Sequence, residues 1–331
     1  MSDKIMKKKS KMQKKVYFSL FQSQFFVNLH KIRISNFTLP MTGLSILIPT
    51  FNGICKELVS ELQKQVATLS MDYEVIVADD GSTSQAAIAE NRGINSIPHC
   101  QYMECQKNRG RAAIRNFLVQ QAQYEWLLFI DSDMTVCRHN FINCYVACAG
   151  HDVVYGGVSI GGDAKALRGN LRYKYEKKEE CQHTAIMRQQ APYQDFHTAN
   201  FMIRRELMLA CPFDESIRQY GYEDVLLGKR LEQKGIAICH IDNPLSFQVF
   251  EDNADFVSKT EEGLRTLHTL RDRLRGYSRM IDFTERHQRL LPLIRLHHQL
   301  WGTLERRLLT GSHPSLAIFK LYKAGYYLSL S

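Results

Sequence analysis

Short apolar runs alternate with amphipathic stretches along the chain from residue 44 onward. Leu44–Ile48, Glu74–Ala78 and Trp126–Ile130 are mostly apolar, as expected for strands that are buried on both faces of a sheet. Between them, apolar positions spaced three or four residues apart predict helices over Lys56–Leu69, Gln85–Asn91 and Arg111–Gln123. Strands that alternate with helices predict an α/β fold with a mostly parallel sheet flanked by helices.

The alternation continues less regularly to about residue 255. Val153–Ser159, Asn200–Ile203 and Ala237–Ile241 are predicted strands, and a charged helical stretch runs from Leu167 to about Arg188. A further helix over Asp224–Gln233 is followed by Gly235, a suitable C-cap residue. We therefore expect one α/β domain over residues 41–255.

From about residue 256 to residue 331 the pattern is helical and basic. Glu285 to Lys323 contains seven Lys/Arg and two Glu, interleaved with leucines and Trp301. A basic amphipathic helix with aromatic residues is typical of an element that lies on a membrane surface. The alternative is a helix that packs its apolar stripe on the main domain, and the sequence leaves both open.

The net charge of +9 over 331 residues is concentrated at the start of the chain. Residues 1–40 contain nine Lys/Arg and one acid, so the remainder is nearly neutral at +1. This distribution argues against a broad nucleic-acid surface and for a basic extension on a neutral body. One hypothesis is that Met41 is the native start and residues 1–40 are a non-native or disordered extension. The other is a basic, aromatic tail that touches anionic lipid.

Cysteine usage and hydropathy bear on localisation. The nine cysteines form no Cys-X-X-Cys motif, and scattered thiols suit a reducing cytosol. No run of 18 apolar residues predicts a transmembrane helix, and the N-terminus does not match a signal peptide. We expect a cytoplasmic protein, with the cytoplasmic face of the inner membrane as one location.

Two carboxylates follow the strand Trp126–Ile130 directly, in Asp131-Ser132-Asp133. The carboxyl ends of strands in α/β folds open into the crevice where ligands bind. Two acids there repel each other unless a cation lies between them, and Mg²⁺ or Mn²⁺ prefers carboxylates together with phosphate oxygens. The motif therefore indicates a metal-bridged phosphate, although Asp-X-Asp also occurs in turns and helix caps.

Polar residues also follow the first two strands. Pro49 and Thr50 end the first strand, and Asp79-Asp80-Gly81-Ser82 ends the second. An acid at this place can accept hydrogen bonds from a base N–H or a ribose hydroxyl. Taken singly, the acidic segment is explained equally well as a turn, but two strand ends with acids in one sheet favour a site.

Two helix starts carry further charged groups. Asn108-Arg109-Gly110-Arg111 opens a helix that includes Arg115, and guanidinium groups there suit phosphate or carboxylate partners. Its alternative is a solvated basic helix face. Tyr220-Gly221-Tyr222-Glu223-Asp224 opens another helix, where acids gain from the helix dipole and where a general base would be held rigidly.

Together these motifs resemble family 2 glycosyltransferases with the GT-A fold, over about residues 44 to 250. Further resemblance lies in Ala199–Arg205 and in Phe213-Asp214-Glu215, which are similar to the segment before the catalytic carboxylates of that family. The resemblance implies Asp224 as catalytic base with Glu223 as its neighbour facing the acceptor. It implies that Asp131 and Asp133 together hold one divalent ion, Mn²⁺ or Mg²⁺, with Asp133 favoured as the direct ligand. It also implies nucleotide-binding roles for Pro49, Thr50, Asp79, Asp80, Arg109, Arg111 and Asp131.

The chain departs from the family in one respect. Many relatives supply a His as an additional metal ligand on a strand after the base helix. Two places in this chain could correspond to it. One is His240, which could simply be a strand residue, and the other is the segment Phe247–Phe250, which contains no His, so this ligand is left unassigned. Thr198 and Asn200 are candidates for acceptor contacts, in a region of loops whose shape the sequence does not define.

The expected function is inverting, metal-dependent transfer of a hexosyl or N-acetylhexosaminyl group from a nucleotide sugar, with UDP-sugars favoured. The hydroxyl acceptor would be a glycan or lipid-linked glycan in polysaccharide or cell-surface glycan synthesis. One alternative is a sugar-nucleotide nucleotidyltransferase, but Asn52-Gly53-Ile54-Cys55 is a poor match to a triphosphate-binding loop. Another is a silent, membrane-associated partner of a second transferase. A dehydrogenase is disfavoured because no Gly-X-Gly-X-X-Gly follows a strand.

Overall fold

Seven strands form the main sheet of the computed structural model, which describes residues 41–330. The prediction for residues 1–40 lies outside this range. The first four strands run parallel to one another, and β8 is antiparallel to both of its neighbours. In spatial order the strands are β3 (Cys100–Glu104), β2 (Asp72–Asp79), β1 (Gly43–Thr50), β4 (Trp126–Ile130), β8 (Asn200–Arg204), β6 (Val153–Tyr155) and β9 (Ile238–His240).

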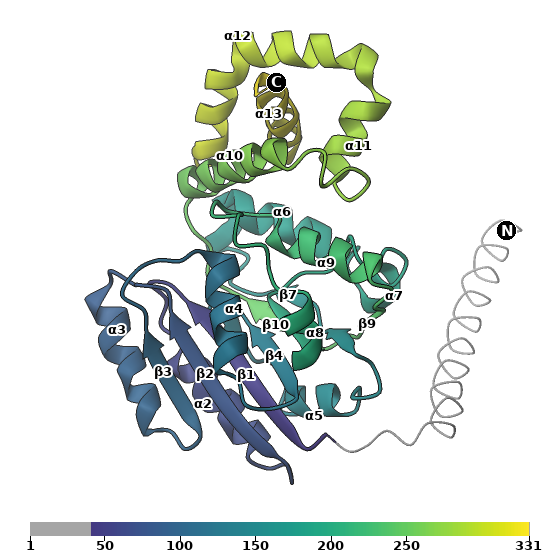
Figure 1. Ribbon diagram of the computed structural model, residues 1–331. Helices are drawn as coiled ribbons and strands as arrows, with labels where there is room; N and C mark the ends of the chain where they lie inside the picture. Colours follow the sequence, from purple (N-terminus) through teal and green to yellow (C-terminus); the bar gives the residue numbers. More distant parts are fainter. Residues whose placement is uncertain (1–40, 331) are drawn as a thin grey trace, which may run out of the picture. The chain divides into compact units, whose positions relative to one another are not determined.

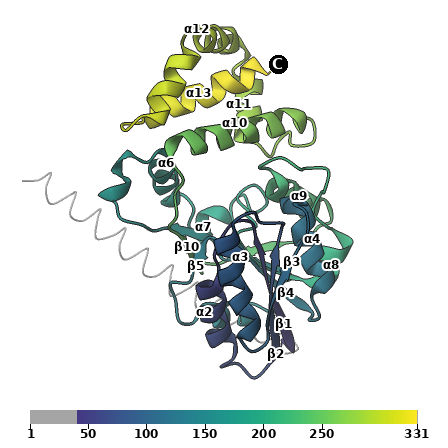
Figure 2. The ribbon, with the colours of Figure 1, turned by 90° about the vertical axis from the view of Figure 1, so that its left-hand side faces the viewer.

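Alternate residues of the central strands feed two cores, one on each face of the sheet. Leu44, Ile46 and Ile48 pack in one core, while Leu47 packs in the other, as the period of two requires. Helices α2 (Lys56–Val66) and α5 (Phe141–Val146) cover the first face. Helices α4 (Arg111–Gln121), α8 (Arg205–Ala210) and α9 (Glu223–Gln233) cover the second (Figures 1 and 2). The predicted α/β fold with a mostly parallel sheet is therefore confirmed.

A second, three-stranded sheet has the order β5-β10-β7. The sequence prediction of one strand over Val153–Ser159 is wrong here, because the chain leaves the main sheet after β6. Gly156 and Gly157 form the break, and a Cβ on Gly156 would lie 2.4 Å from the Tyr145 hydroxyl. The small sheet consists of β5 (Met134–Thr135), β10 (Leu245–Phe247) and β7 (Val158–Ile160).

The remaining helices complete the fold. The predicted helical stretch from Leu167 is divided by turns into a 3₁₀ segment and two short helices. After β10 the chain is helical, and α10 and α13 both contact α6. Among residues 41–330, no helix is both long and apolar enough to cross a membrane. These elements are α3 (Gln85–Arg92), η1 (Gly93–Ser96), η2 (Ala166–Gly169), α6 (Leu171–Glu180), α7 (Ala185–Arg188), α10 (Asn253–Thr269), α11 (Arg279–Arg286), η3 (Gln288–Leu290), α12 (Leu291–Thr310) and α13 (Leu316–Ser329).

The two longest apolar stripes of the C-terminal helices differ in what they contact. In α13, Phe319, Tyr322 and Tyr327 are buried, so this helix packs its stripe as one of the two alternatives proposed. In α12 a row of leucines stays exposed, including Leu293 at 64% and Leu300 at 68%. Helix α12 lies on the side of the helical region away from the sheets (Figures 1 and 2). Packing therefore explains α13 but not the outer face of α12.

Candidate active site

A cavity of about 570 Å³ lies where β4, α6, α9, α10 and α13 meet. Four acids from two distant segments line it, namely Asp131 and Asp133 after β4 and Glu223 and Asp224 at the start of α9. Acids that are far apart in the sequence therefore lie around one cavity, although Asp80 is not among them. Their roles depend on what each carboxylate contacts.

Two residues with positive φ angles precede α9 and set the direction in which this helix begins. Gly221 has a φ of +97° and Tyr222 a φ of +71°, a conformation that residues with a Cβ rarely adopt. The two residues turn the chain sharply and place Glu223 and Asp224 in the first helical turn. Non-glycine residues held in this way cluster at functional sites, because the surrounding structure must hold them there.

Two arginines of α4 connect the acid segments. Arg115 is 2% exposed and its Nη2 donates to Asp131 Oδ1 at 2.5 Å, while its Nη1 lies 3.8 Å from Glu223. One turn earlier, Arg111 donates from Nε to Glu223 Oε1 at 3.0 Å and lies 3.7 Å from Asp131. Glu223 is therefore turned toward the arginines and nearly buried. Its contact with an acceptor stays a prediction.

Asp133 differs from Asp131 in having no such partner. Among residues 41–330, no other side chain donates a hydrogen bond to its carboxylate, which is exposed to the cavity. Desolvation by the cavity walls and the negative charge of Asp131 raise the pKa of Asp133. The carboxylate is thus available to a cation, which would favour its ionised form.

Asp224 has a defined partner. Its Oδ2 lies 2.9 Å from Nδ1 of His197, and its Oδ1 accepts from the Val225 N–H at 2.7 Å. Burial opposes ionisation, but the hydrogen bond from His197 and the positive charge of that residue outweigh it and lower the pKa of Asp224.

The acids that follow β2 are buried and bonded within the protein. Asp80 accepts from the backbone N–H groups of Arg109 and Gly110 at 2.7 and 2.9 Å, and burial raises its pKa in spite of these bonds. Asp79 accepts from the Tyr102 hydroxyl and from the Ser82 N–H. In this structure both acids order the loops at the end of β2, and neither lines the cavity.

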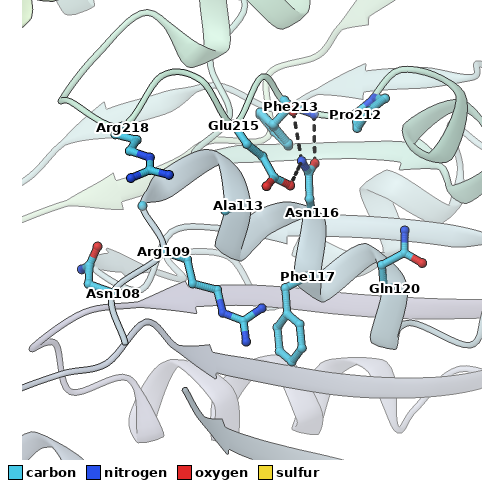
Figure 3. Close-up of a pocket in the computed structure, with 11 residues that line it drawn as sticks. Asn108, Arg109, Ala113, Asn116, Phe117, Gln120, Pro212, Phe213, Glu215 and Arg218 are labelled. Carbon is cyan, nitrogen blue, oxygen red and sulfur yellow. Dashed lines mark hydrogen bonds between the residues drawn. The ribbon is translucent and has the colours of Figure 1, made fainter. Parts of the chain in front are cut away.

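The predicted nucleotide-binding residues therefore divide into two groups. Arg111 and Asp131 line the cavity, whereas Pro49 and Thr50 lie at the end of β1 and do not line it. Arg109 places its guanidinium 4.8 Å from the Phe117 ring centroid, in a separate open cleft of about 860 Å³ between α4 and residues 212–218 (Figure 3). Their nucleotide contacts stay predictions.

Of the candidates for acceptor and metal contacts, some line the cavity and others do not. Thr198 lines the cavity, but Asn200 is buried and its amide donates to the carbonyls of Gly157 and Asn243, which is a structural role. His240 lies outside the cavity, with its ring nitrogens bonded to Arg188 and the Pro192 carbonyl, and burial lowers its pKa to about 4. A further metal ligand therefore stays unassigned. Within residues 41–330 no group of three or more His, Cys, Asp or Glu is arranged to hold a metal.

Several cavity residues were not assigned from the sequence. Arg172 of α6 lies 4.3 Å from the Phe247 ring centroid and donates to Glu251 at 2.5 Å. Lys323 of α13 lies over the Tyr175 ring, and burial lowers its pKa to about 8. These cations come from helices whose docking no local sequence pattern encodes. Arg115 did carry a signal, because it stands four residues after Arg111 on the same helix face.

Comparison with known proteins gives the family context. Residues 45–209 match the sequence profile described as Glycosyl transferase family 2. Chondroitin synthase of Pasteurella multocida is 22% identical over 292 residues, which cover 77% of this chain and 30% of that protein. A protein described as an uncharacterized glycosyltransferase from Haemophilus influenzae is 31% identical over 96 residues, 28% of this chain and 37% of that protein. The chain thus spans about a third of the length of these relatives.

A solved structure supports the GT-A fold. The mannosyltransferase PcManGT from Pyrobaculum calidifontis, in complex with GDP-Man and Mn²⁺, superposes with a TM-score of 0.50 at 14% identity. The match covers 86% of this chain and 84% of that one. At this identity the likeness concerns the fold.

Proposed function

The chain belongs to glycosyl transferase family 2, and we propose that it transfers a hexosyl or N-acetylhexosaminyl group with inversion. The donor is a nucleotide-diphosphate sugar, with UDP-sugars favoured, and the acceptor is a hydroxyl of a glycan or lipid-linked glycan. We assign the reaction to polysaccharide or cell-surface glycan synthesis. One observation carries the proposal: Asp133 and Asp224 face one cavity that also holds Arg111 and Arg172.

The charged residues divide the cavity into a donor end and an acceptor end. Arg111 exposes about half of its side chain (48%) and lines the cavity, as does Arg172, so we assign both to the binding of diphosphate oxygens. Glycosyl transfer builds negative charge on the departing diphosphate, and fixed cations in a cavity stabilise that charge. Asp224 and His197 mark the other end, where the acceptor hydroxyl would lie.

The donor atoms at Asp131 and Asp133 fit a divalent ion. Mg²⁺ and Mn²⁺ are often held by one or two carboxylates, with substrate phosphates and water in the remaining positions. Asp133, whose carboxylate accepts no side-chain hydrogen bond within residues 41–330, is the favoured direct ligand, and Asp131 beside it is hydrogen-bonded to Arg115. When bound, the ion would act as a Lewis acid on the diphosphate.

The acceptor hydroxyl must lose a proton as it attacks. Asp224 is the carboxylate placed to take it, because its position in the first turn of α9 is fixed by the backbone at Tyr222. A single base opposite the leaving diphosphate gives direct displacement, and hence inversion at the anomeric carbon.

A donor screen tests this function. The full chain would be incubated with UDP- and GDP-sugars and Mn²⁺ or Mg²⁺, with Asp224→Asn as the control. We expect one sugar nucleotide to be consumed at a rate that Asp224→Asn loses, and NMR of the product to show the inverted anomer. Retention of configuration, or equal turnover in the variant, would contradict the mechanism.

We also propose peripheral membrane contact through α12, at the cytoplasmic face of the inner membrane. A contiguous exposed apolar row on a helix marks an interaction surface. The row lies beside exposed Arg289 and Arg307, and Glu305, the single acid of α12, is buried. Apolar residues with cations and no exposed acid complement an anionic lipid surface. The exposed members are Leu290, Leu293, Leu296, Leu300, Trp301, Leu304 and Leu308.

Vesicle flotation tests the membrane contact. We expect the full chain to float with vesicles that contain phosphatidylglycerol and not with phosphatidylcholine alone. Leu300→Glu with Leu304→Glu should abolish flotation, whereas Leu209→Glu, at an exposed leucine of α8, should not. Failure of the wild-type chain to float with anionic vesicles would contradict membrane contact. So would a wild-type dimer that the double variant converts to a monomer, because the leucine row would then be a dimer interface.

A further inference from the structure

His197 stands beside the proposed base at the acceptor end of the cavity. Its Nδ1 lies 2.9 Å from Asp224 Oδ2, and its side chain is 41% exposed to the cavity. The ring is held on two sides, by the parallel His183 ring at 6.4 Å and by the Tyr155 ring edge-on at 6.1 Å, both measured between centroids. The imidazole therefore directs Nδ1 at Asp224 and has access to solvent.

The charges around His197 come from several elements. Asp224 of α9, Glu176 of α6 and Asp195 of the loop before β8 all favour its protonated form. Burial works against protonation, as does mutual repulsion with protonated His183, but the acids prevail and raise the pKa of His197 above 6.5. His240 also lies near enough for repulsion between the two rings.

A carboxyl group with a lowered pKa does not retain a proton at neutral pH. Asp224 has a pKa below its ordinary 3.8, while His197 has one above 6.5. A proton delivered to Asp224 is therefore more stable on the imidazole, one hydrogen bond away. Efficient proton acceptors have pKa values near the working pH, which describes His197 better than Asp224.

We propose that His197 is the final acceptor of the hydroxyl proton in this reaction, which rests on the glycosyl transfer proposed above. The O–H bond of the acceptor breaks as its oxygen bonds to the anomeric carbon and the bond to the diphosphate breaks. The proton passes to Asp224 and on to Nδ1 of neutral His197, which must then carry its own proton on Nε2 so that the Nδ1 lone pair is free to accept. The resulting imidazolium faces the Asp224 carboxylate and returns its proton to solvent after turnover.

An imidazole titration tests the pair without substrate. The full chain with ¹⁵N-labelled histidine would be titrated by NMR, with the His197 signal identified from its loss in His197→Asn. We expect a His197 pKa above 6.5 that falls in Asp224→Asn, because the neighbouring negative charge is gone. A His197 pKa at or below 6.5 in the wild type, or one that Asp224→Asn leaves unchanged, would overturn the proposal.

The pH dependence of turnover tests the proton transfer. We expect wild-type kcat to rise with pH through a pKa above 6.5, since His197 must be neutral to receive the proton. His197→Asn can still hydrogen-bond to Asp224 but cannot take its proton, so we expect kcat to fall about 10²- to 10⁴-fold, as in His197→Ala. His151→Asn, at an exposed histidine after α5, is the control that should keep the wild-type profile.

These measurements separate two kinds of failure. Wild-type kcat and pH profile in His197→Asn would mean that His197 only positions Asp224, and would overturn the proposal while leaving glycosyl transfer intact. If no nucleotide sugar is consumed by the wild type, the proposed function fails, and the NMR titration still decides whether the proton-holding pair exists.

Discussion

The two acid pairs of the cavity are built alike. At the end of β4 and at the start of α9, the first acid of each pair is bound by arginines of α4, and the second faces the cavity. Asp131 and Glu223 thus share Arg115 and Arg111. These ion pairs connect the end of β4, α4 and the start of α9, and so hold the segments that carry Asp133 and Asp224.

The second acids differ in their partners, and this difference assigns their tasks. Asp133 has no side-chain donor among the described residues and a raised pKa, which suits a position that a cation fills. Asp224 is bonded to His197 and has a lowered pKa, which suits the handling of a proton. We therefore propose that the two pairs, although built alike, serve different steps because His197 lies beside Asp224 alone.

The largest difference between the first and the second acid of a pair is expected at the start of α9. We predict that Asp224→Asn lowers transfer by about 10²- to 10⁴-fold with nearly unchanged affinity for the nucleotide diphosphate, because it removes the proton acceptor and no donor contact. Glu223→Gln should act chiefly on stability, since Glu223 is turned toward the arginines. Rate assays, calorimetric titration of UDP and GDP, and thermal melts of both variants measure the contrast. Equal rates in the two variants would show that the acids are not divided in this way.

Removing Arg115 tests whether the arginines of α4 hold Asp131 and Glu223 in place. We predict that Arg115→Met lowers the free energy of unfolding by about 3–5 kcal/mol, because Asp131 and Glu223 lose a buried partner. Arg92→Met is the matched control, since Arg92 is exposed and pairs with Glu104 at the surface, where solvent screens the pair and its loss changes stability little. Urea unfolding followed by circular dichroism measures both. Similar losses in the two variants would argue against this role of Arg115.

The smallest effect is expected at the cation position. We predict that Asp133→Asn lowers the affinity for UDP or GDP in the presence of Mn²⁺ by about tenfold, about 1.4 kcal/mol, and leaves the affinity without metal nearly unchanged. Asp163→Asn, at an exposed acid in the loop after β7, is the control. Calorimetric titrations with and without Mn²⁺ measure the difference. An unchanged enhancement by Mn²⁺ would remove Asp133 from the metal site.

Sequence patterns predicted what depends on local periodicity. The β4 strand has the predicted bounds, and its acids lie at a ligand-binding edge because parallel strands end together there. The pattern did not predict β10, because three residues are too few to show a period. It joined β6 to β7, although Gly156 and Gly157 marked the break.

Contacts between distant elements could not be predicted in the same way. The sequence placed acids at Asp131 and Glu223 but not the arginine contacts that hold them, which depend on how α4 packs across the sheet. His197 lies in a loop without periodicity, so its bond to Asp224 became visible only in the fold. Lys323 reaches the cavity because α13 packs on α6, a docking that no local pattern encodes.

A crystal structure of the Asp224→Asn variant with an intact nucleotide sugar and Mn²⁺ would show directly whether Asp133 and residue 224 face the same bound donor. We expect the diphosphate beside Arg111 and Asp133, with the anomeric carbon directed toward residue 224. A nucleotide sugar bound instead in the open cleft beside Arg218 (Figure 3), away from Asp133, would contradict it.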